Sequence, residues 1–279
     1  DGGSLEYLFN PKVVSTGKKS YAGVSNLLRL NENGYYYYDS QRNFAEFDED
    51  ANSFNLYDKP AVNPENKDSA TGQFFPLNSA DDVFSTSGDG SIHAKGINSE
   101  NEVLNHYFGM TMTTDFVQPA GGMVDGDTPM TYEFSGDDDV WVYIDDVLVG
   151  DIGGSHAVTK LKIDFRTGAV YVNGAKQDKS IGDLLAAQGK TGVNGDTLTD
   201  GSYHTLKFFY LERGNYDSNM SLRFNLAQIQ TSDLVKVDQY GQALAGASFN
   251  LYTLDENHRK IDGEGNVGDS ALPLASGET

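Results

Sequence analysis

The sequence predicts a mainly β fold, an antiparallel β-sandwich with short helices. The clearest observation is alternation, because apolar side chains recur at every second position of residues 220–226, the spacing of a half-buried strand. Strand signals recur about every 8–12 residues, separated by turn pairs such as Asn173-Gly174, which is typical of sandwiches and barrels. Helical signal is scarce, so a fold that alternates helices with parallel strands is disfavoured.

Several other segments are expected to be strands because they are rich in β-branched and aromatic residues and are bounded by turn residues. They are residues 35–38, 140–144 and 147–149 around the Asp145-Asp146 turn, 161–165 and 169–172 across Thr167-Gly168, and 204–211. The polar segment 48–70 contains Pro60 and Pro64 and predicts a long loop.

Two segments carry helix signals. Residues 181–188 are followed by Gly189, a common stop for a helix. Residues 99–108 open with Ser99 and have Glu102 three positions later, the spacing of a capping box. Both are expected to be short helices.

Composition excludes several classes of protein. The chain has 279 residues, 41 acidic against 20 basic side chains, a formal charge of −21 and a pI near 4.4. Nucleic acids and anionic membranes are therefore unexpected partners, since both need a basic surface. No apolar run is long enough to insert into a membrane. Cysteine is absent, which excludes disulfides, zinc–thiolate sites and a cysteine nucleophile.

Two domains are expected, residues 1–230 and residues 231–279. The boundary follows the last strand of the first domain, near residues 227–233. The second segment is too short for an independent β-sandwich and is expected to be part of one. Residues 1–9 lack the charged and apolar regions of a signal peptide, so we expect either that a signal peptide was removed or that the sequence starts inside a longer chain.

The strongest candidate site is the acidic run Asp137, Asp138 and Asp139 before the strand 140–144. No Lys or Arg lies between residues 134 and 159 to neutralise it. Adjacent carboxylates repel one another, and calcium is bound by six to eight oxygens of this kind. The alternative is that one Asp forms a turn with its own backbone while the others face solvent.

The segment 136–157, GDDDVWVYIDDVLVGDIGGSHA, resembles the core of the fibro-slime domain, a relative of the PA14 β-sandwich of bacterial toxins, adhesins and yeast flocculins. Residues 72–78 (GQFFPLN), 105–116 (NHYFGMTMTTDF) and 204–226 are similar to further parts of that domain, in the same order. The resemblance implies a Gram-positive bacterial surface adhesin, located outside the cell at the cell wall and belonging to a longer anchored chain.

The resemblance also implies a site. In PA14-type lectins an Asp–Asp pair, joined by a cis peptide bond, binds calcium with an Asn of a later loop, and the calcium holds sugar hydroxyls. The matching metal ligands here are Asp137, Asp138 and Asn219. The matching ligand-binding residues are Asp139, Asn215, Tyr216 and Asp217. Calcium is thus the expected cofactor, and a glycan or another surface ligand the expected partner.

Residues 234–238 and 245–252 resemble the opening strands of a Cna-B/SpaA-type stalk domain. In that family a Lys of the first strand forms an isopeptide bond with an Asn near the last strand. Lys236 matches the Lys, and the segment that would carry its partner is missing. The resemblance therefore implies that Lys236 is an isopeptide candidate that remains unbonded in this chain.

The expected function is an adhesin module that binds calcium and, through it, a carbohydrate. Two alternatives stay open: a calcium-stapled structural or protein-binding module, and the binding module of a polysaccharide-active enzyme. No catalytic activity is expected of the chain itself, because its five His show no paired metal-ligand spacing. Residues 263–268 match GxGxxG but follow no buried strand, so a dinucleotide site is not expected.

Overall fold

The computed structural model divides the chain into two compact units, Asp1–Ile229 and Gln230–Thr279, which are described separately. The described residues are 6–10, 12–13, 17–58, 73–86, 88, 92–94, 104–213, 218–227, 248–254, 257, 259–262, 266–273 and 275–278. The predicted fold class is confirmed, since the chain is mainly antiparallel β-sheet with short helices.

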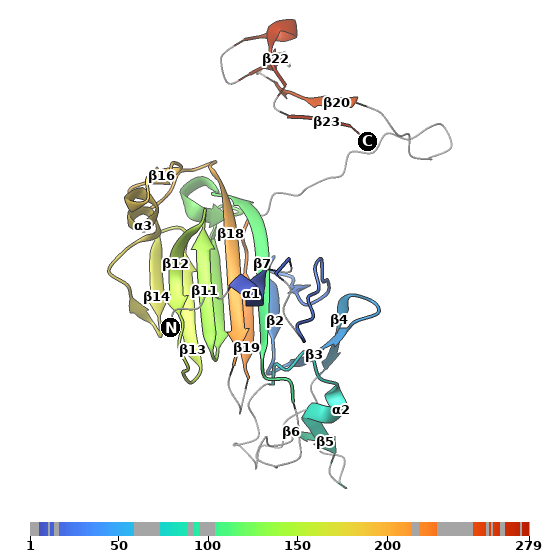
Figure 1. Ribbon diagram of the computed structural model, residues 1–279. Coiled ribbons are helices and arrows are strands. Elements are labelled where there is room, and N and C mark those ends of the chain that lie inside the picture. The colour runs from blue at the N-terminus through green and yellow to red at the C-terminus, as the bar shows by residue number, and fades with distance from the viewer. Residues whose placement is uncertain are drawn as a thin grey trace. The chain divides into compact units, whose positions relative to one another are not determined.

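The first unit contains a large antiparallel sheet of seven strands (Figure 1). In spatial order they are β1 (Arg29–Leu30), β2 (Tyr36–Asp39), β19 (Met220–Phe224), β10 (Thr131–Gly136), β13 (Thr159–Asp164), β14 (Ala169–Val172) and β15 (Ala175–Lys176). A second antiparallel sheet of four strands contains β12 (Val147–Ile152), β11 (Asp139–Ile144), β18 (Tyr203–Glu212) and β7 (Phe108–Val117). Together the two sheets form the sandwich.

The core lies between these sheets because alternate side chains of each strand point inward. In β11 the inward residues are Val140, Val142 and Ile144, all fully buried. Phe208 of β18 lies 5.8 Å from Phe134 of β10 between ring centroids, which joins the two layers. Burial of side chains this large contributes about 1.5–3 kcal/mol each.

Smaller elements surround the sandwich. The short strand pairs are β3 (Asn43–Asp48) with β4 (Ser53–Asp58), β5 (Phe84–Thr86) with β6 (Ile92–Ala94), β8 (Met123–Val124) with β9 (Thr128–Pro129), and β16 (Val193–Asn194) with β17 (Thr197–Leu198). The helices are α1 (Glu6–Phe9), α2 (Ala80–Val83), the 3-10 turn η2 (Ala120–Gly122) and α3 (Ile181–Ala187). Helix α3 confirms the predicted short helix and begins with a capping box at Ser180.

The second unit contains two short antiparallel strand pairs among its described residues. Strand β20 (Ser248–Leu251) pairs with β23 (Ala275–Glu278), and β21 (Thr253–Leu254) pairs with β22 (Lys260–Ile261). A 3-10 turn, η3 (Gly268–Ser270), precedes β23.

Two sequence predictions are wrong in part. Residues 104–107 are not helical and Phe108 begins the ten-residue strand β7, while residues 99–103 lie outside the described part. The predicted loop 48–70 contains strand β4, and residues 59–70 lie outside the described part. In both cases pairing with a neighbouring strand outweighs the local signal: β7 pairs with β18 along its whole length.

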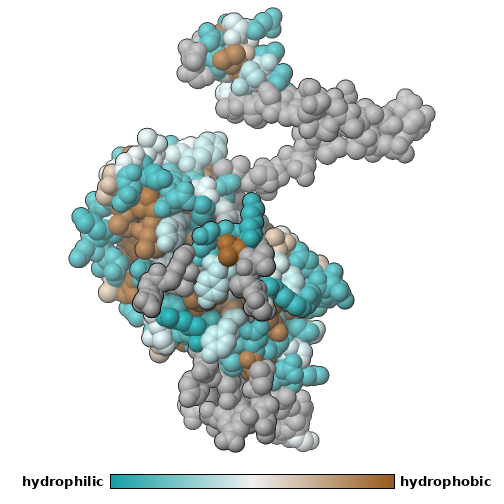
Figure 2. All heavy atoms as spheres, in the orientation of Figure 1, coloured by the Kyte–Doolittle hydropathy of each residue, from teal (hydrophilic) through white to brown (hydrophobic). Residues whose placement is uncertain are grey.

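The surface seen in Figure 2 is largely hydrophilic, with apolar side chains gathered beside α3. Within the described residues, no helix has the length and apolarity needed to cross a bilayer.

Three connections between the sheets meet at one end of the sandwich. They join β10 to β11, β12 to β13, and β18 to β19. Strand pairing places them together, because Gly136 pairs with both Thr159 and Met220, while Asp139 pairs with Leu211. This end, called the crossover end below, carries the acidic run.

Candidate functional site

The acidic pair forms the tight connection between the two sheets. Gly136 ends β10, and a Cβ at this position would lie 2.2 Å from the backbone oxygen of Asn219, so only glycine allows this approach. Asp138 has a φ of +45°, in the left-handed region that Asp tolerates better than most residues. The Asp137–Asp138 bond is trans, whereas the resemblance implied a cis bond.

Asp137 is bonded to Asn219, which is 82 residues later in the chain. The Asp137 backbone N–H donates to the Asn219 carbonyl at 3.2 Å. In return, Asn219 donates its backbone N–H to Asp137 Oδ1 and its side-chain Nδ2 to Asp137 Oδ2, the latter at 3.0 Å. These bonds fasten the β10–β11 connection to the start of β19.

Two buried oxygens beside this contact have no hydrogen-bond partner among the described residues. They are Asp138 Oδ2 and Asn219 Oδ1, on side chains whose residues are 5% and 6% exposed. A buried polar atom without a partner costs about 1–3 kcal/mol, and more if it is charged. Carboxylate and amide oxygens of this kind are ligands that a hard cation accepts.

Burial dominates the electrostatics of this end. It raises the pKa of Asp137 above its ordinary value, and the neighbouring charge of Asp138 adds a smaller increase. Burial likewise raises the pKa of Tyr210 well above its usual range, with a further contribution from Glu212. Burial thus disfavours the charged form of Asp137, and the hydrogen bonds from Asn219 oppose that effect.

Sequence reasoning missed Glu212 and Ser218, which border the loop between β18 and β19. Tyr210 donates its hydroxyl hydrogen to Glu212 Oε2 at 3.1 Å, and its oxygen lies 3.0 Å from Ser218 Oγ. Glu212 is 1% exposed. The alternation along β18 could have predicted that Glu212 is buried, since it continues the inward series of Phe208 and Tyr210.

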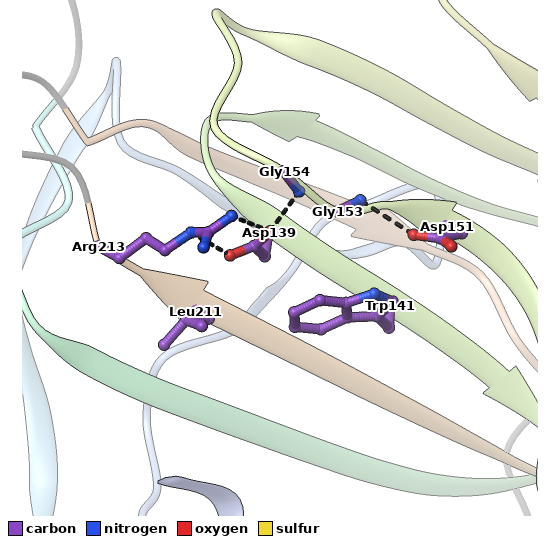
Figure 3. Close-up of a pocket in the computed structure, with 7 residues that line it drawn as sticks. All are labelled: Asp139, Trp141, Asp151, Gly153, Gly154, Leu211 and Arg213. Atoms are coloured by element: carbon purple, nitrogen blue, oxygen red, sulfur yellow. Dashed lines mark hydrogen bonds and ion pairs between the residues drawn. The ribbon is translucent and has the colours of Figure 1, made fainter. Parts of the chain in front are cut away.

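Asp139 makes a different set of contacts. Its Oδ2 lies 2.6 Å from Arg213 Nε, and its Oδ1 accepts a bond from Arg213 Nη2 at 3.0 Å and one from the Gly154 backbone N–H (Figure 3). Asp139 is 2% exposed. Its carboxylate is therefore held by Arg213 on the outer face of the four-stranded sheet.

The structure does not describe the other predicted site residues. Asn215, Tyr216, Asp217 and Lys236 lie outside the described residues. Asp145 and Asp146 follow β11, and Asp151 lies on β12. Across the described ranges, no three His, Asp or Glu side chains gather as a metal-binding group.

The residues that do come together offer oxygen ligands alone. Asp137 and Asp138 supply carboxylates, and Asn219 supplies an amide oxygen. Hard divalent cations such as calcium take this donor set, whereas zinc and copper favour nitrogen and sulfur. The three side chains fit calcium by chemistry and would fill only part of its shell.

The chain is similar to curated proteins of the social amoeba Dictyostelium discoideum. Protein psiF is 30% identical over 153 residues, which are 55% of this chain and 18% of psiF. Protein psiR is 28% identical over 123 residues, 44% of this chain and 9% of psiR, and protein psiP is 33% identical over 92 residues, 33% of this chain and 8% of psiP. The chain therefore spans less than a fifth of each of these relatives. No family model and no solved structure matches it.

These comparisons correct the identity implied by the resemblances. The relatives come from a eukaryote, so the assignment to a Gram-positive bacterial adhesin at the bacterial cell wall is wrong. The PA14 and Cna-B assignments are corrected with it, since no family model supports either.

Proposed function

We propose that the first unit is a binding module that holds calcium at Asp137, Asp138 and Asn219 and binds a carbohydrate through it. The observation that carries the proposal is a pair of buried oxygens, Asp138 Oδ2 and Asn219 Oδ1, that have no hydrogen-bond partner within the described part of the chain. Natural proteins leave few such atoms, and a site that is ready for an ion is one of the accepted explanations. Arg213, a cation at this end of the sandwich, is engaged by Asp139.

The carbohydrate part of the proposal follows from the incomplete shell. Calcium takes six to eight oxygens, more than Asp137, Asp138 and Asn219 provide. The other positions can be filled by backbone carbonyls, water or the neighbouring hydroxyls of a sugar. Three loops meet at this end of the sandwich, and binding sites are commonly built from loops on a rigid scaffold.

A second candidate function is a structural calcium staple without sugar binding. The observation that favours it is the set of bonds between Asp137 and Asn219, which already joins two connections. A cation at this point would strengthen the junction between the sheets.

Calorimetric titration of calcium into chelator-treated protein tests the metal site. We expect one site with a dissociation constant between about 0.1 and 10 µM, the range of moderate protein calcium sites. Asp138→Asn should weaken binding at least tenfold, about 1.4 kcal/mol. Asp146→Asn is the matched control, because it alters the other Asp–Asp pair, and should leave binding unchanged.

A glycan array with calcium and with chelator then tests the ligand. Hits that chelator abolishes and Asp138→Asn removes would support carbohydrate binding through the metal. Calcium binding without any chelator-sensitive hit would favour the structural staple. Equal calcium affinity of wild type and Asp138→Asn would place the metal elsewhere and overturn both candidates.

A further inference from the structure

A separate hollow lies on the outer face of the four-stranded sheet, and the proposed cation site does not use it (Figure 3). It is lined by Asp139, Trp141, Asp151, Gly153, Leu211 and Arg213. We propose that this hollow, called the Trp141 pocket, binds the ammonium group of a lysine side chain presented by a partner protein.

Strand register places an aromatic ring beside a carboxylate. Trp141 of β11 pairs directly with Asp151 of β12, so the two side chains stand on the same face. Directly paired positions of an antiparallel sheet have Cβ atoms about 4.5–5.5 Å apart. A cation over the indole is therefore also within reach of the Asp151 carboxylate.

The charges around the pocket favour a cation. Asp139 neutralises Arg213 through the two contacts described above. In Figure 3 the guanidinium approaches Asp139 from the side away from Trp141, while Asp151 lies beyond the indole. The Asp151 carboxylate, which forms no ion pair with any described residue, thus remains next to the ring that binds cations best. The formal charge of −21 repels anionic ligands and draws in cations.

The pocket is held in shape by its neighbours. A Cβ on Gly153 would lie 3.0 Å from Trp141 Nε1, so the glycine backbone packs directly against the indole. Phe9 of α1 contacts the same ring edge-on, with 6.4 Å between centroids. Asp151 accepts the Gly153 N–H through Oδ1 at 3.0 Å, and its Oδ2 bonds to no other described residue. These contacts hold the side chains that line the pocket in place, so binding a ligand costs little further side-chain entropy.

A lysine side chain fits this arrangement better than a simple metal cation or an arginine. Leu211 lines the wall beside Trp141 and can contact the aliphatic stem. The compact ammonium presents its donors to one carboxylate, whereas a guanidinium prefers a two-point carboxylate contact, which here Asp139 and Arg213 already form.

Trp141 is the single tryptophan of the chain, so its fluorescence reports on this pocket alone. The whole chain is titrated in chelator with Nα-acetyl-lysine N-methylamide, which keeps the result independent of calcium. We expect a saturable change with a dissociation constant on the order of 1 mM, typical of one small contact. The same compound acetylated at Nε has no charge and should bind at least tenfold more weakly.

Asp151→Asn keeps an acceptor for the Gly153 N–H and removes the charge, so it should weaken binding about fivefold or more. Asp178→Asn removes one charge at an exposed position outside the pocket and should change the affinity less than about twofold. Absence of a saturable change, equal binding of the acetylated compound, or equal binding by Asp151→Asn would each overturn the proposal.

Discussion

Strand β11 has an Asp–Asp pair at each end, and the two pairs are opposites in their surroundings. At its start, Asp138 is buried and one of its oxygens has no described partner. At its far end, Asp145 Oδ2 lies 2.6 Å from His204 Nδ1, and Asp146 Oδ1 lies 2.5 Å from Lys207 Nζ. The same dipeptide is thus compensated at one end and uncompensated at the other.

The pKa shifts follow this difference. Lys207 lowers the pKa of Asp146, which is exposed, while burial raises the pKa of Asp137. Left-handed backbone is common to both pairs, at Asp138 in the first and at Asp145 and Asp146 in the second, so it does not account for the difference. The difference comes from the neighbouring strand β18, which runs along the whole of β11. It places basic residues beside the far end of β11 and the buried Glu212 beside its start.

The largest expected effect is that of calcium on the uncompensated pair. Millimolar calcium acting on a site of micromolar dissociation constant should stabilise the fold by about 4 kcal/mol. Melting temperature, measured with calcium and with EDTA, checks this. The double variant Asp137→Asn/Asp138→Asn should lose the shift. If the wild-type melting curves are identical with calcium and with EDTA, the Asp137–Asp138 pair does not differ from the Asp145–Asp146 pair in the way proposed.

The next effect concerns the buried partner at the compensated end. The His204 side chain is 1% exposed, and its Nε2 lies 2.6 Å from Ser202 Oγ while its Nδ1 contacts Asp145. His204→Leu leaves both partners without their bond and should cost about 2–3 kcal/mol in urea unfolding. A loss below about 0.5 kcal/mol would show that solvent satisfies these groups and that the compensated end is not tightly built.

A smaller effect is the pH dependence of Asp137 in calcium-free protein. Its folded pKa is raised, so the folded state binds more protons than the unfolded state between the ordinary and the raised value. Stability should therefore fall as pH rises through that interval and not recover above it. Urea unfolding of wild type and Asp137→Asn across this range isolates the contribution. If the difference in free energy of unfolding between wild type and Asp137→Asn does not vary with pH, the raised pKa of Asp137 is contradicted.

The smallest effect is expected at the exposed ion pair. Lys207 and Asp146 side chains are 38% and 70% exposed, so water screens their attraction. Lys207→Gln should cost less than about 1 kcal/mol, and the cost should shrink further in high salt. A loss of stability that is independent of salt and as large as that of His204→Leu would mean that the ion pair is needed to order the turn.

The sequence predicted the strands that carry strong alternation. Residues 204–211, 140–144 and 220–226 correspond to β18, β11 and β19. The error at β7 has a physical cause: Ser99 and Glu102 are a local helix signal, whereas β7 exists because it pairs with β18, about 90 residues away. Long-range pairing of this kind has no signature within a short window.

For the candidate site, sequence reasoning named candidate residues but not the side chains that contact them. The acidic run was evident, and the resemblance pointed to Asn219, which the structure brings to Asp137. The pairing of Asp139 with Arg213 and the burial of Glu212 were not foreseen. The Asp139–Arg213 pairing depends on how β18 aligns with β11, whereas the burial of Glu212 follows the alternation along β18 itself.

By itself the sequence determined the fold class, the absence of cysteine chemistry, the strong negative charge and the position of the acidic run, because these follow from composition and from the period of side-chain alternation. Only the tertiary structure decided which carboxylates are neutralised. The free energy of a charged group depends on burial and on partners within a few ångströms, and those partners come from strands far apart in the chain.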